Sequence, residues 1–241
     1  MFFPQVLDAR REVIFKRRAT QLDKLLQKYD VDIRQIADIG AGFGLFLDEW
    51  HSIRPGCQRI AVEPSHEMAE ICRGKGIDIV VESVVEKVDD ETFDADLIVC
   101  FEVLEHVHSP KQFLAAIANL CKPGGHLVLS TLCIEGFDLS VLKDKSDSIA
   151  PPHHINFGSR KGFEVLLESV GFKLKHFETP GILDVEIVGN KLRKGDISDA
   201  EIGFIAQIYG ADKTSVDRDN FQRFLSDLKL SSHCWLLAER E

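Results

Sequence analysis

Residues 36–47 read Ile36-Ala37-Asp38-Ile39-Gly40-Ala41-Gly42-Phe43-Gly44-Leu45-Phe46-Leu47. The apolar run that opens this stretch ends in three alternating glycines, and helix-like spacing of apolar residues resumes directly after them. The pattern predicts a buried parallel strand, a tight turn and the N-terminus of a helix. Because glycine lacks a Cβ atom, the backbone at positions 40, 42 and 44 can bend sharply and a ligand can touch it. The free N–H groups of the helix start would face that ligand. A tight turn without a ligand is the alternative.

Predicted strands and helices alternate through most of the chain. A turn, Lys122-Pro123-Gly124-Gly125, precedes the fifth strand, and a loop is expected over residues 133–157. One or two amphipathic helices are expected over residues 5–29. This alternation predicts a doubly wound α/β fold with a mostly parallel sheet and ligands at the carboxyl ends of its strands. The expected strands cover residues 36–39, 59–64, 77–81, 93–100, 126–132 and 172–178, and the helices between them cover residues 45–52, 65–73, 110–120 and 159–170.

The composition limits the kinds of partner that the protein can have. The length of 241 residues fits one α/β domain. The net charge of -10 argues against a nucleic acid or an anionic membrane as the main partner. The six cysteines are scattered without a Cys-x-x-Cys pair, which favours reduced thiols in a cytoplasmic protein and no metal site. No signal peptide is expected at the first residues, and no apolar stretch is expected to span a membrane.

The second predicted strand ends in Glu63-Pro64, some twenty residues after the glycine turn. Proline holds the residue before it extended, so the Glu63 carboxylate should lie just beyond the end of the strand. An acid at this place suits hydrogen bonds to both hydroxyls of a ribose. A surface acid on a loop is the alternative for Glu63.

The glycine spacing separates two nucleotide-like ligands. A dinucleotide fingerprint, Gly-x-Gly-x-x-Gly, requires a glycine at position 45, where this chain has Leu45. Asp38 also places a carboxylate where a pyrophosphate would lie. A negative group suits the amino group and sulfonium of S-adenosylmethionine instead. A nicotinamide-dependent oxidoreductase is therefore the disfavoured alternative, and a protein that binds the nucleoside cofactor without chemistry is a third.

With these residues in view, the chain resembles the class I S-adenosylmethionine-dependent methyltransferases, and its small-molecule branch in particular. The resemblance implies a Rossmann-like sheet of seven strands with an antiparallel last strand, an N-terminal helix and a helical insertion before that strand. We expect a single methyltransferase domain over residues 1–241. Its parts are a helical segment (1–34), a cofactor-binding core (35–178), the insertion (179–232) and the last strand (233–241). The motifs that carry the resemblance cover residues 38–44, 61–64, 101–107, 122–128 and 154–159.

The resemblance also implies a set of cofactor contacts. The glycines would approach the methionine part, Glu63 would bind the ribose, and Glu102 would face either the cofactor pocket or another part of the protein. Position 84 often holds an acid that reaches the adenine, whereas here it is Val84, so Glu82 or a backbone contact could substitute. Glu105 and His106 are expected to open the next helix rather than to act in catalysis. The implied cofactor-binding residues are Asp38, Gly40, Gly42, Gly44, Glu63, Ser83, Val84, Cys100, Phe101 and Glu102.

Methyl transfer from a sulfonium is an in-line displacement, so the enzyme mainly aligns the acceptor with the methyl group. A hydroxyl acceptor must also lose a proton, and histidine is the usual group that takes it. His153 and His154 lie in the loop after the fifth strand, and His154 is favoured because it begins a matched motif. A histidine pair packed on Phe157 or on the preceding prolines is the alternative, and Glu102 is another candidate base.

The expected function is methylation of an oxygen of a small molecule, with S-adenosylhomocysteine as the second product. Residues 179–185 and 230–235 resemble methyltransferases of surface-sugar and secondary-metabolite pathways, so a sugar or a secondary metabolite is the expected acceptor class. The insertion could serve as a lid, as a substrate wall or as the contact of a homodimer.

Overall fold

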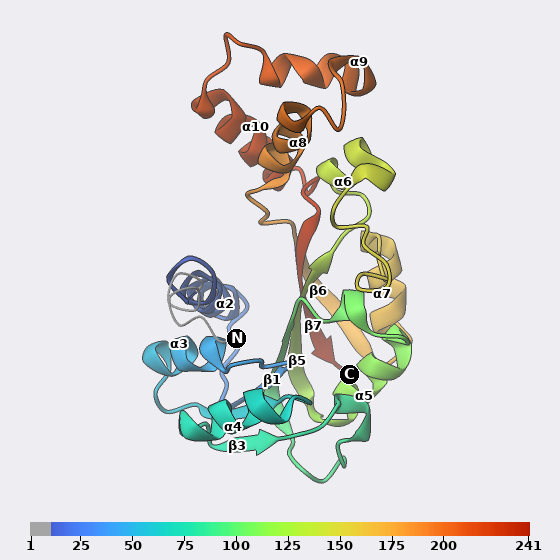
Figure 1. Cartoon of the computed structure of the whole chain (residues 1–241). Coiled ribbons are helices and arrows are strands. Elements are labelled where there is room, and N and C mark those ends of the chain that lie inside the picture. Colours follow the sequence, from blue (N-terminus) through green and yellow to red (C-terminus); the bar gives the residue numbers. More distant parts are fainter. Residues whose placement is uncertain (1–10) are drawn as a thin grey trace. The chain divides into compact units, whose positions relative to one another are not determined.

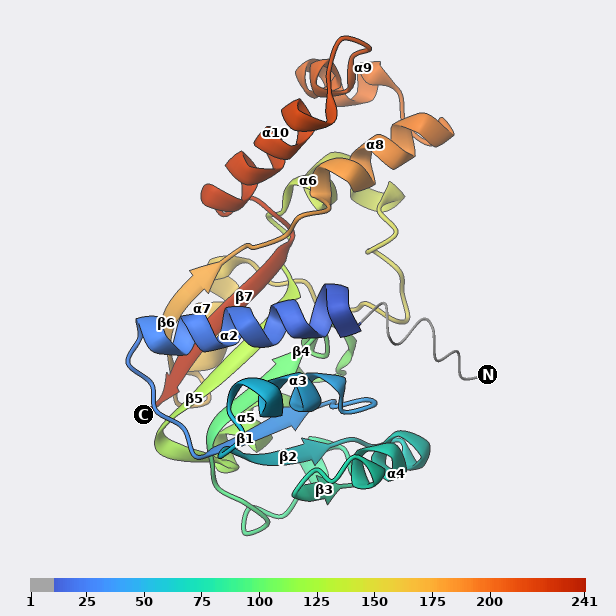
Figure 2. The ribbon, with the colours of Figure 1, turned by 90° about the vertical axis from the view of Figure 1, so that its left-hand side faces the viewer.

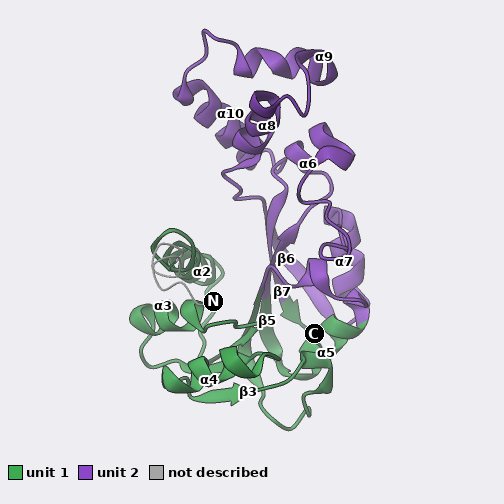
Figure 3. Cartoon of the chain, in the orientation of Figure 1, with its two compact units in different colours: residues 1–100, 112–127, 239–241 green, residues 101–111, 128–238 purple. Residues whose placement is uncertain are grey.

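The computed structural model describes residues 11–241, so the first ten residues of the predicted N-terminal helical segment lie outside the described residues. The chain divides into two compact units, which Figure 3 colours separately. The first unit holds residues 1–100, 112–127 and 239–241, and the second holds residues 101–111 and 128–238. The predicted single domain with four parts follows different boundaries and stays a prediction.

The predicted seven-stranded sheet is confirmed. Strand β1 pairs in parallel with β2 on one side and with β4 on the other, and β2 pairs in parallel with β3. The last strand, β7, runs antiparallel between β5 and β6 (Figure 2). The order across the sheet is β3-β2-β1-β4-β5-β7-β6. The strands are β1 (Gln35–Ile39), β2 (Gln58–Val62), β3 (Ile79–Val81), β4 (Ala95–Phe101), β5 (Cys121–Leu132), β6 (Phe172–Glu178) and β7 (His233–Arg240).

The first unit places the start of helix α3 directly after the glycine turn. The predicted amphipathic helix is present from a π-helical turn, η1 (Arg11–Phe15), into α2 (Lys16–Lys28), whose apolar face is buried and which packs beside α3 (Figure 2). Because tertiary packing stabilises such faces, helices with little propensity of their own still form. The other helical elements of this unit are α3 (Leu45–Ile53), α4 (His66–Gly74), the 3-10 turn η2 (Val85–Lys87) and most of α5 (Pro110–Asn119).

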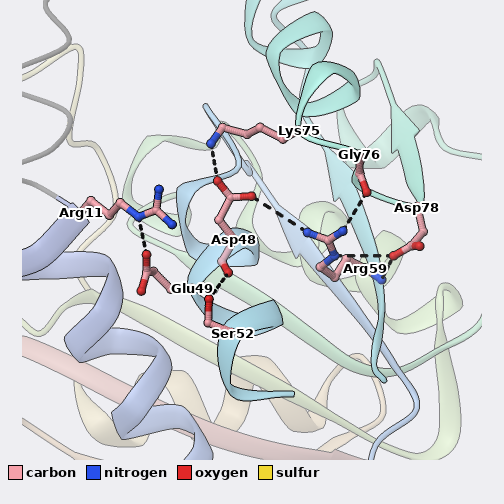
Figure 4. Close-up of polar contacts among 8 residues, drawn as sticks. All are labelled: Arg11, Asp48, Glu49, Ser52, Arg59, Lys75, Gly76 and Asp78. Atoms are coloured by element: carbon pink, nitrogen blue, oxygen red, sulfur yellow. Dashed lines mark hydrogen bonds and ion pairs between the residues drawn. The ribbon is translucent and has the colours of Figure 1, made fainter. Parts of the chain in front are cut away.

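Polar contacts hold α3 to its neighbours in this unit (Figure 4). Asp48 on α3 pairs with Lys75 and lies 4.0 Å from the guanidinium of Arg59. Arg59 is buried and also donates to the Gly76 carbonyl at 2.7 Å, while its backbone N–H donates to Asp78 at 2.8 Å. Buried charges are tolerated only when they are paired and hydrogen-bonded, as here. The network therefore ties the helix after the glycine turn to β2 and to the connection between α4 and β3.

The second unit contains a helical cluster, defined as α6, η4, α8, α9, η5 and α10, which Figure 1 shows mostly in orange and red. Its apolar core includes Phe137, Leu142, Val188 and Leu225. The predicted helical insertion is confirmed, and residues 199–209 form a short α-helix followed by a 3-10 segment. These elements are α6 (Phe137–Leu142), η4 (Lys143–Lys145), α8 (Asp184–Lys194), α9 (Asp199–Ile202), η5 (Gly203–Tyr209) and α10 (Ser215–Asp227). The unit also holds the 3-10 turn η3 (Leu104–His106) and α7 (Arg160–Glu168).

Two local predictions are wrong. The segment 133–157, expected as a loop, contains α6, because its apolar side chains pack into the helical cluster rather than because the sequence strongly favours a helix. The expected turn at residues 122–125 lies within β5. Gly124 there has a φ of +76°, and a Cβ on Gly125 would lie 2.8 Å from the Lys122 carbonyl oxygen. The glycines therefore serve a tight kink at the beginning of the strand.

Within residues 11–241, none of the helices combines the length and the apolar character that crossing a bilayer requires.

Candidate functional site

The glycine turn joins β1 to α3 as predicted. Gly40, Gly42 and Gly44 have φ angles of +79°, +56° and +67°, a region that residues with a Cβ rarely adopt. A Cβ on Gly44 would also lie 2.7 Å from Ile77 Cδ1, whereas a Cβ on Gly42 would meet no atom within 4 Å. Close packing therefore requires glycine at position 44, and the open space at Gly42 leaves room for a ligand.

Glu63 is buried and holds the glycine turn in place. One carboxylate oxygen accepts a hydrogen bond from the Gly42 N–H at 2.8 Å, and the other accepts one from the Ser65 N–H at 2.8 Å. The N–H of Gly40 in turn donates to the Val62 carbonyl at 2.9 Å. Each carboxylate oxygen has a second lone pair, so these contacts leave acceptor capacity for ribose hydroxyls. The spacing in the sequence suggested the ribose role but not the contact with Gly42.

Asp38, two residues ahead of the first glycine, is buried in β1. Burial raises the pKa of this carboxyl to about 7, with Arg18 acting to lower it and the charge of Glu63 acting to raise it. A cation brought next to Asp38 would favour its ionised form. The structure therefore provides a buried carboxyl that complements a positively charged ligand.

The residues assigned to the adenine lie after β3. The Ser83 hydroxyl donates to the Val84 carbonyl at 3.0 Å, and the Val84 side chain is exposed. Glu82 is paired with His66 at 2.9 Å and with Arg73 at 3.1 Å, and these hydrogen bonds lower its pKa. Glu82 is thus already engaged in surface ion pairs. The adenine contacts of Ser83 and Val84 stay predictions.

The end of β4 carries Cys100, Phe101 and Glu102. Cys100 is fully buried, and Phe101 packs on Trp235 with ring centroids 5.3 Å apart. Their predicted contacts with the homocysteine chain are untested and stay predictions. Glu102 has a left-handed backbone, with φ +56°, and one of its carboxylate oxygens lies 2.8 Å from His233 Nε2.

Sequence reasoning missed His233 and Ser130 as neighbours of Glu102. The Ser130 hydroxyl donates to the same Glu102 oxygen at 2.5 Å, and the Ser130 carbonyl accepts from the Glu102 N–H at 3.0 Å. His233 is the first residue of β7 and is separated from Glu102 by 131 positions. The only available signal was that this histidine directly precedes the apolar run of the last strand.

Glu105 joins two of the matched motifs, at residues 101–107 and 154–159. Its backbone carbonyl accepts from the Ile155 N–H at 2.9 Å, and its buried carboxylate accepts from the Thr131 hydroxyl at 2.9 Å. Asn156 donates to the carbonyls of Leu104 and Val107, at 3.1 and 2.6 Å. Burial raises the pKa of Glu105, and the charge of Glu102 raises it further.

The expectation that Glu105 and His106 open the next helix is wrong. They form the separate turn η3, and α5 begins only at Pro110, whose fixed φ suits a first helical position. Glu105 instead holds the loop that carries the predicted histidines.

His154 packs on His106, with ring centroids 4.8 Å apart. His154 Nδ1 lies 2.8 Å from the Ser148 carbonyl, and His106 Nδ1 lies 2.8 Å from the carbonyl of His153. A carbonyl only accepts hydrogen bonds, so each ring donates from Nδ1, and in the neutral ring Nε2 keeps its lone pair. The His153 side chain is exposed. The assignment of proton transfer to His154 or His153 stays a prediction.

Two groups of donor atoms among residues 11–241 are close enough to hold a metal ion. In each group the atoms lie within 4.8 Å of one another. The first group is Glu105, His106 and His154, and the second is the exposed set His66, Glu70 and Glu82. The expectation of no metal at the site stays a prediction.

A cavity of about 300 Å³ lies in the second unit beside η3 and α7. Its walls are mostly apolar, and Thr131 and Asn156 contribute polar groups. A volume of this order suits a small molecule or part of one. The remaining lining residues are Leu104, Pro110, Ile155, Phe157, Gly158, Gly162, Phe163 and Leu166.

Comparison with known proteins places these features in a family. The model of a methyltransferase domain matches residues 8–176, which is more than half of the chain. The ubiquinone biosynthesis O-methyltransferase of Xanthomonas oryzae pv. oryzae is 34% identical over 118 residues, covering 46% of this chain and 48% of that protein. The corresponding enzyme of Alkalilimnicola ehrlichii is 33% identical over 105 residues, covering 41% and 42%. The match thus spans about half the length of the curated relatives.

Solved structures support the same fold over nearly the whole chain. The plantazolicin methyltransferase BpumL has a TM-score of 0.61 at 15% identity and covers 96% of this chain and 85% of that chain. The magnesium protoporphyrin IX methyltransferase of Synechocystis PCC 6803 has a TM-score of 0.57 at 14% identity, covering 94% and 83%. The glycine turn, the strand order and the matched residues agree, and the chain belongs to the methyltransferase domain family.

Proposed function

We propose that this protein transfers a methyl group from S-adenosylmethionine to an oxygen atom of a small molecule. The observation that carries the proposal is the glycine turn with two buried carboxyls, Asp38 and Glu63, at the carboxyl ends of neighbouring parallel strands. Membership of the methyltransferase family supports the reaction class. Two solved neighbours, BpumL and the Synechocystis enzyme, are described with bound S-adenosylhomocysteine, the product of such a transfer.

The residues of the turn fit this cofactor. Asp38 would complement the positive charge of the methionine part, and the open space at Gly42 would allow the ligand to approach the backbone. Glu63 would bind the ribose hydroxyls while it keeps its hydrogen bonds to the backbone of the turn. When bound, the cofactor supplies an electrophilic methyl group on a sulfonium. Gly40, Gly44, Ser83, Val84, Cys100, Phe101 and Glu102 complete the proposed contact set.

Oxygen is the proposed acceptor atom for two reasons. The curated relatives are named O-methyltransferases, and histidines that can accept a proton lie in the second unit. The mostly apolar cavity of that unit fits a small organic molecule better than a polymer. Whether the acceptor is a sugar or a secondary metabolite stays a prediction, as do a homodimer through the helical cluster and a cytoplasmic location.

Titration calorimetry with S-adenosylhomocysteine and with NAD tests the cofactor assignment. We expect binding of the first and not of the second, and binding of NAD alone would overturn the proposal. A screen of hydroxyl-bearing small molecules for formation of S-adenosylhomocysteine tests the activity. Turnover with any of them excludes a protein that only binds the cofactor.

A further inference from the structure

The backbone of Glu102 is held in an unfavourable conformation at the end of β4. Its φ of +56° is uncommon for a residue with a Cβ, and such conformations persist only where surrounding contacts hold them. Here the N–H donates to the Ser130 carbonyl, and the carboxylate accepts from the Ser130 hydroxyl. These contacts direct the Glu102 side chain to His233, 2.8 Å away.

Glu102 determines which nitrogen of His233 carries the proton. An ionised carboxylate only accepts hydrogen bonds, so Nε2 donates to Glu102, and in the neutral ring Nδ1 keeps its lone pair. The structure gives Nδ1 of His233 no hydrogen bond among residues 11–241. The His233 side chain is 30% exposed, so part of the ring is open to a ligand.

The position of this pair in the fold is that of a ligand site. Glu102 directly follows β4, Ser130 lies near the end of β5, and His233 begins the antiparallel β7. All three therefore lie at the carboxyl edge of the sheet, where open α/β sheets bind their ligands.

The pair also differs in chemistry from the predicted base, His154. A histidine that accepts a proton becomes a cation, and a carboxylate behind it stabilises that cation directly. His154 Nδ1 pairs with the neutral Ser148 carbonyl, and the Glu105 carboxylate within 4.8 Å of its ring accepts from Thr131. Glu105 and Cys234 lie close enough to the pair for the charge of Glu102 to act on them. Burial has the largest effect and raises the pKa of both groups, and the charge of Glu102 raises both further. For Cys234, the charge of Cys133 has a larger effect than the charge of Glu102.

We propose that His233, oriented by Glu102, is a further catalytic residue that accepts the proton of the acceptor's hydroxyl at Nδ1. The inference rests on the proposed function. As the acceptor oxygen forms its bond to the methyl carbon, the carbon–sulfur bond breaks and its electron pair neutralises the sulfonium. The hydroxyl proton passes to Nδ1 and then to solvent. Glu102 is a positioning residue for this step, and Ser130 positions Glu102.

The first test measures turnover on an acceptor found in the screen above. His233→Ala should lower kcat by about a hundredfold or more, because general base catalysis is typically worth 10²–10⁴-fold. Affinity for S-adenosylhomocysteine should stay within about threefold. Glu102→Gln keeps the shape without the charge and should lower kcat by about tenfold. The acidic limb of the kcat profile against pH should be lost in His233→Ala.

Matched controls are available in the same unit. His176 Nε2 pairs with Glu178 at 3.1 Å on β6, so His176→Ala removes a similar pair and should leave kcat within about twofold. His154→Ala and His153→Ala should each cost less than tenfold. Wild-type kcat in His233→Ala, or a hundredfold loss in His154→Ala alone, would return the role to the predicted histidine.

A second test needs no acceptor. Long-range ¹H–¹⁵N NMR of the imidazole rings should find His233 as the Nε2–H tautomer, with its signals assigned by their loss in His233→Ala. The Nδ1–H tautomer would overturn the inference even if no acceptor is found. A wild type that forms no product with any acceptor while His233 is the Nε2–H tautomer would count against the proposed function instead.

Discussion

Two pairs of buried carboxyls, Asp38 with Glu63 in the first unit and Asp138 with Asp184 in the second, are used differently. In the first unit, Glu63 accepts two backbone hydrogen bonds, and Asp38 has a pKa raised to about 7 by burial. In the second, Asp184 accepts from Ser231 at 2.6 Å and from the Ser232 N–H at 2.7 Å. Asp138 is fully buried, and burial raises its pKa to about 6, with Ser232 acting to lower it and the charge of Asp184 acting to raise it.

The comparison teaches that a buried carboxyl with a raised pKa does not by itself mark a binding site. Asp38 is followed by a turn whose glycine at position 42 has open space around it, so a ligand can reach this region. Asp138 lies in the first turn of α6, where Gly136 packs tightly on the backbone of Ser232. We therefore assign Asp38 to the cofactor and Asp138 to the packing of the helical cluster.

The largest effect is expected at Gly44. Gly44→Ala should lower the free energy of unfolding by about 2–4 kcal/mol, from the left-handed backbone and the overlap with Ile77 together. Gly42→Ala, which has the backbone cost without the overlap, should lose about 1–2 kcal/mol. Urea unfolding monitored by circular dichroism measures the free energy of unfolding of both variants. Equal losses would mean that packing at Gly44 does not matter.

The next largest effect is on cofactor affinity and concerns Glu63, whose carboxylate accepts two backbone hydrogen bonds in the first unit. Glu63→Ala should weaken binding of S-adenosylhomocysteine by about tenfold to a few hundredfold, since hydrogen bonds to a charged group are worth about 1.5–3 kcal/mol each. Calorimetry on a variant shown to be folded measures this. The control is Glu67→Ala on the exposed face of α4, which should bind like the wild type. Unchanged affinity in Glu63→Ala would make the acid purely structural.

The smallest expected effect is the change in the free energy of unfolding caused by Asp38→Asn and Asp138→Asn. These two variants compare the carboxyls of the two units most directly. Both carboxyls have folded-state pKa values above the unfolded value near 3.8, so their neutral forms stabilise the fold below about pH 4. That stability is lost as pH rises through about 7 for Asp38 and about 6 for Asp138. Each variant should therefore be more stable than the wild type at pH 8, by on the order of 1–3 kcal/mol.

Cofactor binding separates the two variants. Asp38→Asn should weaken S-adenosylmethionine by about tenfold or more, through the loss of a charged hydrogen-bond acceptor. Asp138→Asn should bind it normally. Thermal unfolding between pH 4 and pH 8 with calorimetry in parallel measures both quantities. Normal binding by Asp38→Asn would show that the two carboxyls are alike and that our assignment of Asp38 is wrong.

The sequence alone determined the sheet, the glycine turn and the family. These features depend on local patterns: apolar runs, glycines that permit positive φ, and strand ends marked by residues such as Glu63. The sixth strand, for example, was predicted over the residues that form β6. Local patterns did not predict α6, because its stability comes from packing in the helical cluster.

The tertiary structure alone decided how the polar groups pair. The Gly42 N–H meets a carboxylate 21 positions away, and Glu102 meets a histidine 131 positions away. A hydrogen bond of this kind requires two atoms within about 3 Å and in line, and the packing of whole strands fixes that geometry. The periodicity of a sequence reports which face a residue occupies, but it carries no information about which distant group the side chain will meet.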